Sequence, residues 1–255
     1  MLSVLIPTYN YRCYTLVADL REQLEREQCP YEIIVADDGS RDRVSIIANL
    51  KINEFGNCRY IRLEKNLGRS GIRNFLIDEA RGKWLLFMDS DARVVSTNFI
   101  SRYLAASEGK EDVIVGGLTN PESLPSPEVT LRYFYEKAAE SERGAQYRQQ
   151  HPYDRFSTFN FMARKEVLSQ IRFSTECKDY GWEDYLLGKE LEKEGKTILH
   201  IDNPLMHMGI ENNNIYLHKT EVALRTLHSL PAQLVEGKDG HVRLGAEEVA
   251  MHEWA

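Results

Sequence analysis

Short apolar runs recur along the first half of the sequence and limit its fold class more than any other feature. They lie at residues 2–6, 32–36, 83–88 and 112–115, and an alternating segment at 58–63 adds a further strand. Unbroken apolar runs of this kind are typical of strands buried on both faces of a parallel sheet. The intervening segments carry apolar residues at helical spacing and predict helices at 14–27, 42–50, 70–80 and 97–106. This alternation predicts an α/β fold with a mostly parallel central sheet and helices on both faces.

Three of the predicted strands are followed directly by polar clusters. In chain order these are Pro7, Thr8, Tyr9 and Asn10; Asp37, Asp38, Gly39 and Ser40; and Asp89, Ser90 and Asp91. In open α/β sheets a ligand binds outside the carboxyl ends of the strands. We therefore expect the three clusters to meet in one crevice.

Asp89 and Asp91 place two hard oxygen ligands at the end of a strand. Mg²⁺ and Mn²⁺ prefer such ligands and are commonly shared with substrate phosphates. A metal ion there would neutralise a diphosphate leaving group. The alternative for an isolated Asp-x-Asp is a turn with a helix cap, and the position after a buried strand favours the metal site.

Asp37 and Asp38 suit nucleotide recognition, because a carboxylate can accept a hydrogen bond from a base imide or a ribose hydroxyl. An Asx turn leading into a helix is the alternative. Tyr9 is a candidate for stacking on the base, and a purely structural aromatic is the alternative.

A glycine-containing loop at residues 66–74 runs into the predicted helix 70–80, for which Ser70 is the expected cap. The free N–H groups at the helix start, with Arg69 and Arg73, suit phosphate binding. The glycines match neither the dinucleotide-binding pattern nor the P-loop pattern.

The segment Gly-Trp-Glu-Asp at residues 181–184 opens another predicted helix. Sugar transfer by displacement needs a base, and a carboxylate kept ionised at a helix start suits this role. Tyr180 and Trp182 offer flat faces to a sugar, whereas an acidic cap beside core aromatics is the alternative. His207 lies in an apolar run and is either structural or a third ligand beside the two aspartates.

The formal net charge of −7, without any Lys/Arg-rich run, disfavours nucleic-acid binding. Cys13, Cys29, Cys58 and Cys177 lack C-x-x-C spacing and are expected to be reduced thiols. We find neither a signal peptide nor an apolar run long enough to span a membrane, and we expect a cytoplasmic protein.

A predicted helix at 131–149 carries four basic residues, Arg132, Lys137, Arg143 and Arg148. Peripheral contact of this helix with the inner face of a membrane is one interpretation, and an ordinary solvated helix is the other. Further helices are expected at 183–194 and 215–230, and further strands at 156–163 and 197–201.

Six segments, in this order, resemble the family 2 glycosyltransferases of the Rossmann-like GT-A fold. They are SVLIPTYN (3–10), IIVADDGS (33–40), NLGRSGIRN (66–74), MDSD (88–91), FNFMARKEVL (159–168) and GWEDYLLG (181–188). The resemblance covers residues 1–210, and its specificity lies in the ordered set rather than in any one segment.

The resemblance implies an inverting transfer of a sugar from a nucleotide diphosphate, usually a UDP-sugar, to a hydroxyl of a glycan or lipid-linked saccharide. It implies Mn²⁺ or Mg²⁺ as cofactor, held by Asp89, Asp91 and His207, with Asp184 as the base. Of the two aspartates, the resemblance implies Asp91 as the more direct ligand, and Arg93, which stands where many members have a third acid, slightly weakens that choice.

The implied substrate contacts follow the same segments. Donor contacts are implied for Pro7, Thr8, Tyr9, Asp37, Asp38, Asn66, Gly68, Arg73, Asp89 and Ser90. Acceptor contacts are implied for Asn160, Trp182 and Glu183. We expect one domain, with a donor half (1–117), an acceptor and catalytic half (118–210), and a C-terminal helical appendage and tail (211–255).

Two other functions compete with this interpretation. A sugar-phosphate nucleotidyltransferase would need a glycine-rich phosphate loop after the first strand, where PTYNYR stands instead. A catalytically silent protein of the same fold would be expected to have lost one acidic site, yet both are present. The sequence leaves open the sugar, the acceptor and the oligomeric state.

Overall fold

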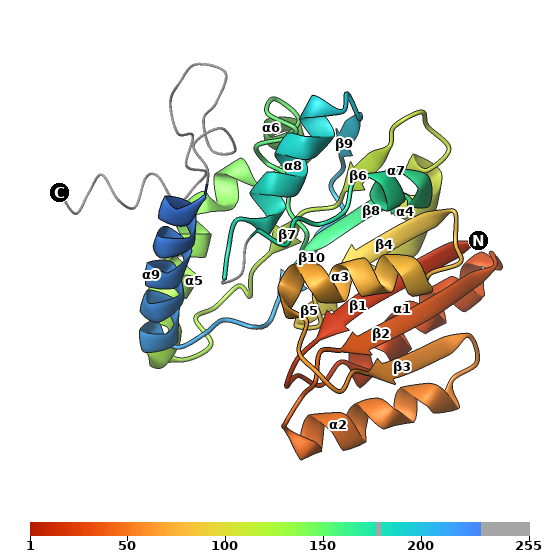
Figure 1. The fold of residues 1–255 in the computed structure, drawn as a ribbon, viewed down its shortest axis with the longest axis horizontal. Helices are drawn as coiled ribbons and strands as arrows, with labels where there is room; N and C mark the ends of the chain where they lie inside the picture. The colour runs from red at the N-terminus through yellow and green to blue at the C-terminus, as the bar shows by residue number, and fades with distance from the viewer. Residues whose placement is uncertain (177–179, 231–255) are drawn as a thin grey trace.

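Seven strands form the main sheet within the part of the chain that this computed structural model describes, residues 1–176 and 180–230. Figure 1 shows the strands side by side with helices on both faces. Their order is β3 (Cys58–Arg62), β2 (Tyr31–Asp37), β1 (Leu2–Thr8), β4 (Trp84–Met88), β8 (Asn160–Arg164), β6 (Val113–Val115) and β9 (Ile198–His200). β8 runs antiparallel to both of its neighbours, and the other pairs are parallel. The predicted α/β class and mostly parallel sheet are therefore confirmed.

Each central strand buries both of its faces, as the unbroken apolar runs predict. In β1, Val4 and Ile6 belong to one core and Leu5 to the other. The first core lies under α1 (Tyr14–Glu27) and α4 (Phe99–Ala106). The second lies under α3 (Gly68–Glu79), α7 (Lys165–Gln170) and α8 (Glu183–Lys193). The edge strand β3 is flanked by α2 (Arg43–Leu50) and the 3₁₀ helix η1 (Lys51–Glu54).

A second, three-stranded sheet joins distant parts of the chain. It consists of β5 (Ala92–Val94), β10 (Leu205–His207) and β7 (Leu118–Thr119), with β10 in the middle. β10 pairs with β5 so that His207 lies opposite Ala92. This register brings His207 next to Asp91, although more than a hundred residues separate them in the sequence. The sequence patterns did not predict this sheet, because its strands are only two or three residues long.

The predicted single helix at 131–149 is wrong. The structure has α5 (Thr130–Ala138), preceded by the 3₁₀ turn η2 (Pro127–Val129), then the 3₁₀ turn η3 (Ala139–Glu142) and α6 (Ala145–Arg148). Gly144 has an extended backbone conformation, and the N–H of Ala145 donates to Asp202 (2.7 Å), which starts a new helix. Figure 1 shows α9 (Asn213–Ser229) packed beside α5.

The predicted basic face of this segment is also absent. Arg148 is buried, and Arg132 and Arg143 face the buried Glu136. The arrangement does not support a membrane-contacting basic helix. Within the described ranges, no helix is both long and apolar enough to cross a bilayer. Cys177 and the tail from residue 231 lie outside the described residues.

Two smaller expectations need correction. Ser70 does not cap α3, because it lies inside the helix and is buried. The predicted strand at 156–163 begins only at Asn160, because Ser157 and Thr158 leave the sheet to donate hydrogen bonds to Asp184. That departure places two hydroxyl groups at the centre of the site described next.

Candidate active site

The polar clusters at the ends of β1 and β2 meet as the sequence predicts. The N–H of Asp38 donates to the carbonyl of Thr8 (2.9 Å), and the N–H of Asn10 donates to the hydroxyl of Ser40 (2.7 Å). Pro7 lies in the same strand end, and the Tyr9 side chain is 48% exposed. Tyr9, the aromatic residue of this cluster, is therefore accessible to a planar ligand at the sheet edge.

The carboxylates of Asp37 and Asp38 both accept hydrogen bonds from other groups of the protein. Asp37 is fully buried and accepts hydrogen bonds from the Tyr60 hydroxyl and the Ser40 N–H. The Asp38 carboxylate accepts from the N–H groups of Leu67 (2.6 Å) and Gly68 (3.0 Å). Burial raises the pKa of Asp38. Through these contacts, Asp37 stabilises the end of β2, and Asp38 holds the loop before α3 in place.

Asn66 and Gly68 complete that loop. The Asn66 amide donates to the carbonyl of Asp38 (2.9 Å) and accepts from the N–H of Gly68 (3.0 Å). Gly68 has a φ of +75°, a conformation that glycine adopts without strain. The loop thus fixes the start of α3, from which Arg69 and Arg73 project toward the acidic residues.

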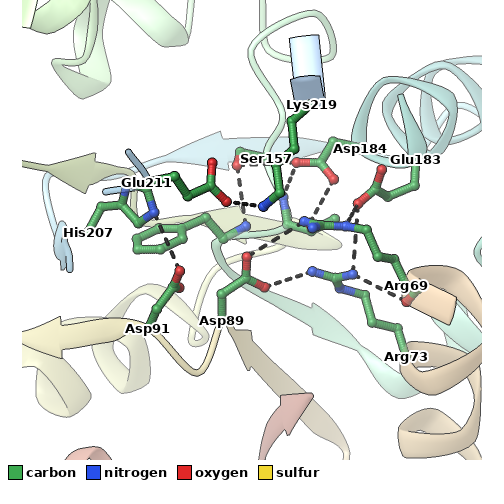
Figure 2. Close-up of polar contacts among 12 residues, drawn as sticks. Arg69, Arg73, Asp89, Asp91, Ser157, Glu183, Asp184, His207, Glu211 and Lys219 are labelled. Carbon is green, nitrogen blue, oxygen red and sulfur yellow. Dashed lines mark hydrogen bonds and ion pairs between the residues drawn. The ribbon is translucent and has the colours of Figure 1, made fainter. Parts of the chain in front are cut away.

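Arg69 and Arg73 form an ion-pair network with Asp89 and Glu183, which Figure 2 shows. Arg73, with only 3% of its side chain exposed, contacts Asp89 at 2.7 Å and Glu183 at 4.0 Å. Arg69 pairs with Glu183 and lies 3.9 Å from Asp89. Burial alone would raise the pKa of Glu183, but the two guanidinium groups outweigh it and hold that pKa below its usual range.

This network changes two predicted roles. Glu183 is buried against arginines, so it is not placed to contact an acceptor. Asp89 is engaged with Arg73, whereas Asp91 two residues later faces His207. Ser90 lies in the turn between the two aspartates and is partly exposed. Of the two aspartates, Asp91 is thus the one whose carboxylate lies beside an imidazole.

Asp91, His207 and Glu136 form a carboxylate–imidazole–carboxylate row. His207 Nε2 lies 3.5 Å from Asp91 Oδ2, and His207 Nδ1 lies 3.1 Å from Glu136 Oε1. Burial would lower the pKa of His207, but the two carboxylates outweigh it and raise it to about 9. A side chain at Gly209 would clash with the Asp91 carboxylate, so the close approach of this segment requires glycine.

The row fits a divalent metal ion bound by two protein ligands. Asp91 and His207 would hold the ion, since their facing oxygen and nitrogen atoms lie 3.5 Å apart, and the ion would supply positive charge to a substrate phosphate. Glu136 would orient the imidazole through its other nitrogen, as outer carboxylates do in many metal sites. No described part of the chain gathers three or more metal-ligating side chains, so further ligands would come from substrate phosphates and water.

Asp184 lies at the start of α8, held by hydrogen-bond donors. The Thr158 hydroxyl donates to it at 2.7 Å, the Thr158 N–H at 3.0 Å, and the Ser157 hydroxyl at 3.4 Å. Burial, and then the neighbouring Glu183, raise the pKa of Asp184 above its usual range. Figure 2 shows Asp89, Asp91 and Asp184 around a common region of the site.

Two residues predicted to contact the acceptor form hydrogen bonds within the protein. The Asn160 amide donates to the carbonyls of Gly117 (2.8 Å) and Asn203 (2.9 Å) and accepts from the Tyr103 hydroxyl (2.7 Å). These contacts use the hydrogen-bonding capacity of the Asn160 side chain at the first residue of β8. The Trp182 indole donates to the carbonyl of Ala223 in α9 (2.7 Å), so this ring anchors the C-terminal helix. Trp182 is only partly buried.

Three further residues reach the site from segments without a sequence motif. Glu136 comes from α5, and Glu211 and Lys219 come from the last segment and α9. Figure 2 shows Lys219 paired with Glu211, to the left of Asp184 in that view. The Lys219 ammonium lies 5.0 Å from the centroid of the Tyr180 ring. No local pattern marks these residues, because their position depends on how α5 and α9 pack.

The chain is similar to known proteins in sequence and in fold. The family model described as "Glycosyl transferase family 2" matches residues 3–172. The poly(ribitol-phosphate) beta-N-acetylglucosaminyltransferase TarS of Staphylococcus aureus is 32% identical over 142 residues, which cover 51% of this chain and 24% of TarS. This chain thus spans about a quarter of the length of that relative.

Two solved structures share the fold. The crystal structure of S. aureus TarS 1–349 in complex with UDP-GlcNAc has a TM-score of 0.58 at 18% identity, covering 97% of this chain and 68% of that one. Mannosyltransferase PcManGT from Pyrobaculum calidifontis, in complex with GDP-Man and Mn²⁺, has a TM-score of 0.57 at 13% identity, covering 99% and 79%. The predicted GT-A fold is confirmed by this likeness.

The row of Asp91, His207 and Glu136 predicts the effect of neutralising the outer carboxylate. Glu136→Gln should weaken Mn²⁺ binding about 10–100-fold, because the imidazole loses its orienting partner. Calorimetric titration of Mn²⁺ in the presence of UDP measures this. Glu140→Gln, at an exposed carboxylate one turn later, is the matched control. Equal Mn²⁺ affinity in both variants would contradict the role given to Glu136.

The hydrogen bonds of Asn160 predict a loss of stability. Asn160→Ala should lower the free energy of unfolding by about 1–3 kcal/mol, because buried partners lose their hydrogen bonds. Chemical denaturation measures this, with Asn214→Ala in an exposed position of α9 as control. An unchanged unfolding midpoint in Asn160→Ala would contradict the structural role.

Proposed function

Because this chain belongs to glycosyl transferase family 2, we propose that it transfers a sugar from a nucleotide diphosphate donor, a UDP-sugar, to a hydroxyl of a glycan or lipid-linked saccharide. The donor class is supported by the neighbour of the same fold that was crystallised with UDP-GlcNAc. The transfer inverts the configuration at the anomeric carbon, since a single displacement with one base is the chemistry that these residues offer.

The contrast between Asp184 and the other acidic residues is the observation that carries this proposal. Asp89 and Glu183 are charged carboxylates paired with Arg73 and Arg69, and Asp91 faces His207. Asp184 has hydrogen-bond donors but no ion-pair partner among the described residues. A carboxylate in such surroundings has a raised pKa and takes up a proton more readily, which suits a general base.

The proposed step follows from these positions. The acceptor hydroxyl gives its proton to Asp184 while its oxygen forms a bond to the anomeric carbon of the donor sugar. The bond between that carbon and the diphosphate oxygen breaks on the opposite side, and the diphosphate leaves with the electron pair. Thr158 and Ser157 hold the carboxylate in one orientation throughout.

The donor would lie between the strand ends and α3. Tyr9 offers a flat face for the base, and the loop at Asn66 and Gly68 lies beside it. Asp91 and His207 would hold Mn²⁺ or Mg²⁺, with Glu136 orienting the histidine. When bound, the metal supplies positive charge for the diphosphate. Mn²⁺ is supported by the neighbour that was crystallised with GDP-Man and Mn²⁺.

The two competing functions, nucleotidyl transfer and silent binding, have less support. Family membership favours glycosyl transfer over nucleotidyl transfer to a sugar phosphate. A silent binding protein would bind UDP and Mn²⁺ without turnover, and the retained Asp184 argues against it. Release of UDP from UDP-sugars, followed with a panel of saccharide acceptors, distinguishes these possibilities.

Asp184→Asn should lower the rate of transfer by about 10²–10⁴-fold while UDP affinity stays within about twofold, because the amide cannot accept the proton. In the parent enzyme the rate should fall with acid once the pH passes below the raised pKa of Asp184. Transfer kinetics and UDP calorimetry measure the two effects. Asp78→Asn, at an exposed carboxylate on α3, is the control. Near-normal turnover in Asp184→Asn would refute the base assignment.

The two aspartates of the Asp-x-Asp segment should behave differently. Asp91→Ala should abolish the Mn²⁺ dependence of UDP binding, because it removes one of two protein ligands. Asp89→Asn should keep that dependence and instead lower stability, because the buried Arg73 loses its nearest charged partner. Calorimetric titration of UDP with and without Mn²⁺ is the measurement. Retained Mn²⁺ dependence in Asp91→Ala would exclude the proposed metal site.

A further inference from the structure

A cavity of about 230 Å³ lies beside the proposed reaction centre, on the side away from β1 and β2. Strands β6 to β8 and the segment from α5 to α6 enclose it. Its lining includes three arginines in a protein of net charge −7. They are Arg143, Arg148 and Arg155.

Arg148 is a buried cation that forms no ion pair with any carboxylate in the described residues. Its guanidinium donates to the carbonyls of Arg143, Val115, Gly116 and Ile201 and to Nδ1 of His200. His200 is neutral, because burial lowers its pKa to about 4, and its Nε2 donates to the carbonyl of Pro152. No carboxylate of the described ranges forms an ion pair with Arg148, and Asp202 acts on it only from a longer distance.

Arg155 and Arg143 add positive charge to the lining of the same cavity. Arg155 pairs with Glu142 (2.9 Å), and their side chains are 25% and 38% exposed. Arg143 lies 3.9 Å from Glu136, which already serves Arg132 and His207. Glu142 is the carboxylate that lines the cavity beside the three guanidinium groups. Of the three arginines, Arg148 is thus the one that no described carboxylate pairs with, and a buried cation of this kind favours an anion nearby.

The cavity touches the reaction centre at two points. Ser157 lines it and donates a hydrogen bond to Asp184. Phe159 lines it, and its ring lies edge-on to the His207 imidazole, with centroids 5.5 Å apart. A ligand held here therefore lies next to the proposed base, whereas the predicted donor contacts lie at the ends of β1, β2 and β4.

We propose that this cavity binds a phosphate group of the acceptor, so that the acceptor is a phosphate-bearing polyol or saccharide. The inference rests on the proposed glycosyl transfer and names its acceptor class. Arg148 supplies a fixed positive potential, and Arg155 and Arg143 supply donors at the wall. Leu118 and Phe159 add apolar side chains to the lining, which suit the carbon skeleton of a polyol. An anionic acceptor also needs such cations, because Asp184, Asp91 and the donor phosphates would otherwise repel it.

Calorimetric titration of glycerol 3-phosphate, glycerophosphoglycerol and glycerol into protein saturated with UDP and Mn²⁺ tests this. UDP occupies the donor site, so that phosphate binding there does not contribute. Arg155→Gln should weaken binding of glycerol 3-phosphate about tenfold, because it removes a charged donor. Glu142→Gln should strengthen it about threefold, because the competing carboxylate is neutralised. Lys193→Gln, on the exposed face of α8, should change neither.

The outcomes separate this proposal from the one on which it rests. Tighter binding of the monoester indicates a free phosphorylated acceptor, and equal or tighter binding of the diester indicates a link within a phosphodiester polymer. Glycerol binding as well as its phosphate, or Arg155→Gln and Glu142→Gln both leaving the affinity unchanged, would overturn the phosphate site. Failure of the wild type to bind UDP would instead count against the proposed function, and the same titrations without UDP would still decide the cavity.

Discussion

The ion pairs of Arg69 and Arg73 with Asp89 and Glu183 join three segments that are far apart in the sequence. They tie the first turn of α3 to the end of β4 and to the start of α8. Arg73 is almost fully buried, so its charge is tolerable only because two carboxylates surround it. The network therefore fixes the spacing between the strand ends, where the donor would lie, and the helix that carries Asp184.

A second constraint comes from the three-stranded sheet and from α5. The pairing of β10 with β5 sets His207 opposite Ala92, and Glu136 reaches the same imidazole from α5. A one-residue shift in that pairing would turn His207 to the other face of the small sheet and separate it from Asp91. The row of acid, imidazole and acid thus depends on a short ladder of backbone hydrogen bonds rather than on a local motif.

The sequence predicts most of the fold, because buried strands and amphipathic helices leave strong periodic patterns. It also predicts which strand ends meet, since parallel strands bring their carboxyl ends to one edge. It fails where position depends on tertiary packing. Asn160 and Glu183 look like exposed polar groups in a motif, yet one closes a buried hydrogen-bond network and the other neutralises arginines. In the sequence, Glu136 looks like an ordinary glutamate of a helix. Its contact with His207 depends on the position of β10.

Glu183 and Asp184 show how one dipeptide can serve structure and chemistry at once. At a helix start, consecutive side chains point in directions about 100° apart, so two adjacent carboxylates meet different surroundings. Glu183 turns toward Arg69 and Arg73, which hold its pKa low and keep it charged. Asp184 turns toward Thr158 and Ser157, where burial and the charge of Glu183 raise its pKa. The fixed negative charge of Glu183 therefore makes Asp184 a better proton acceptor. The two carboxylates have different roles because their surroundings differ.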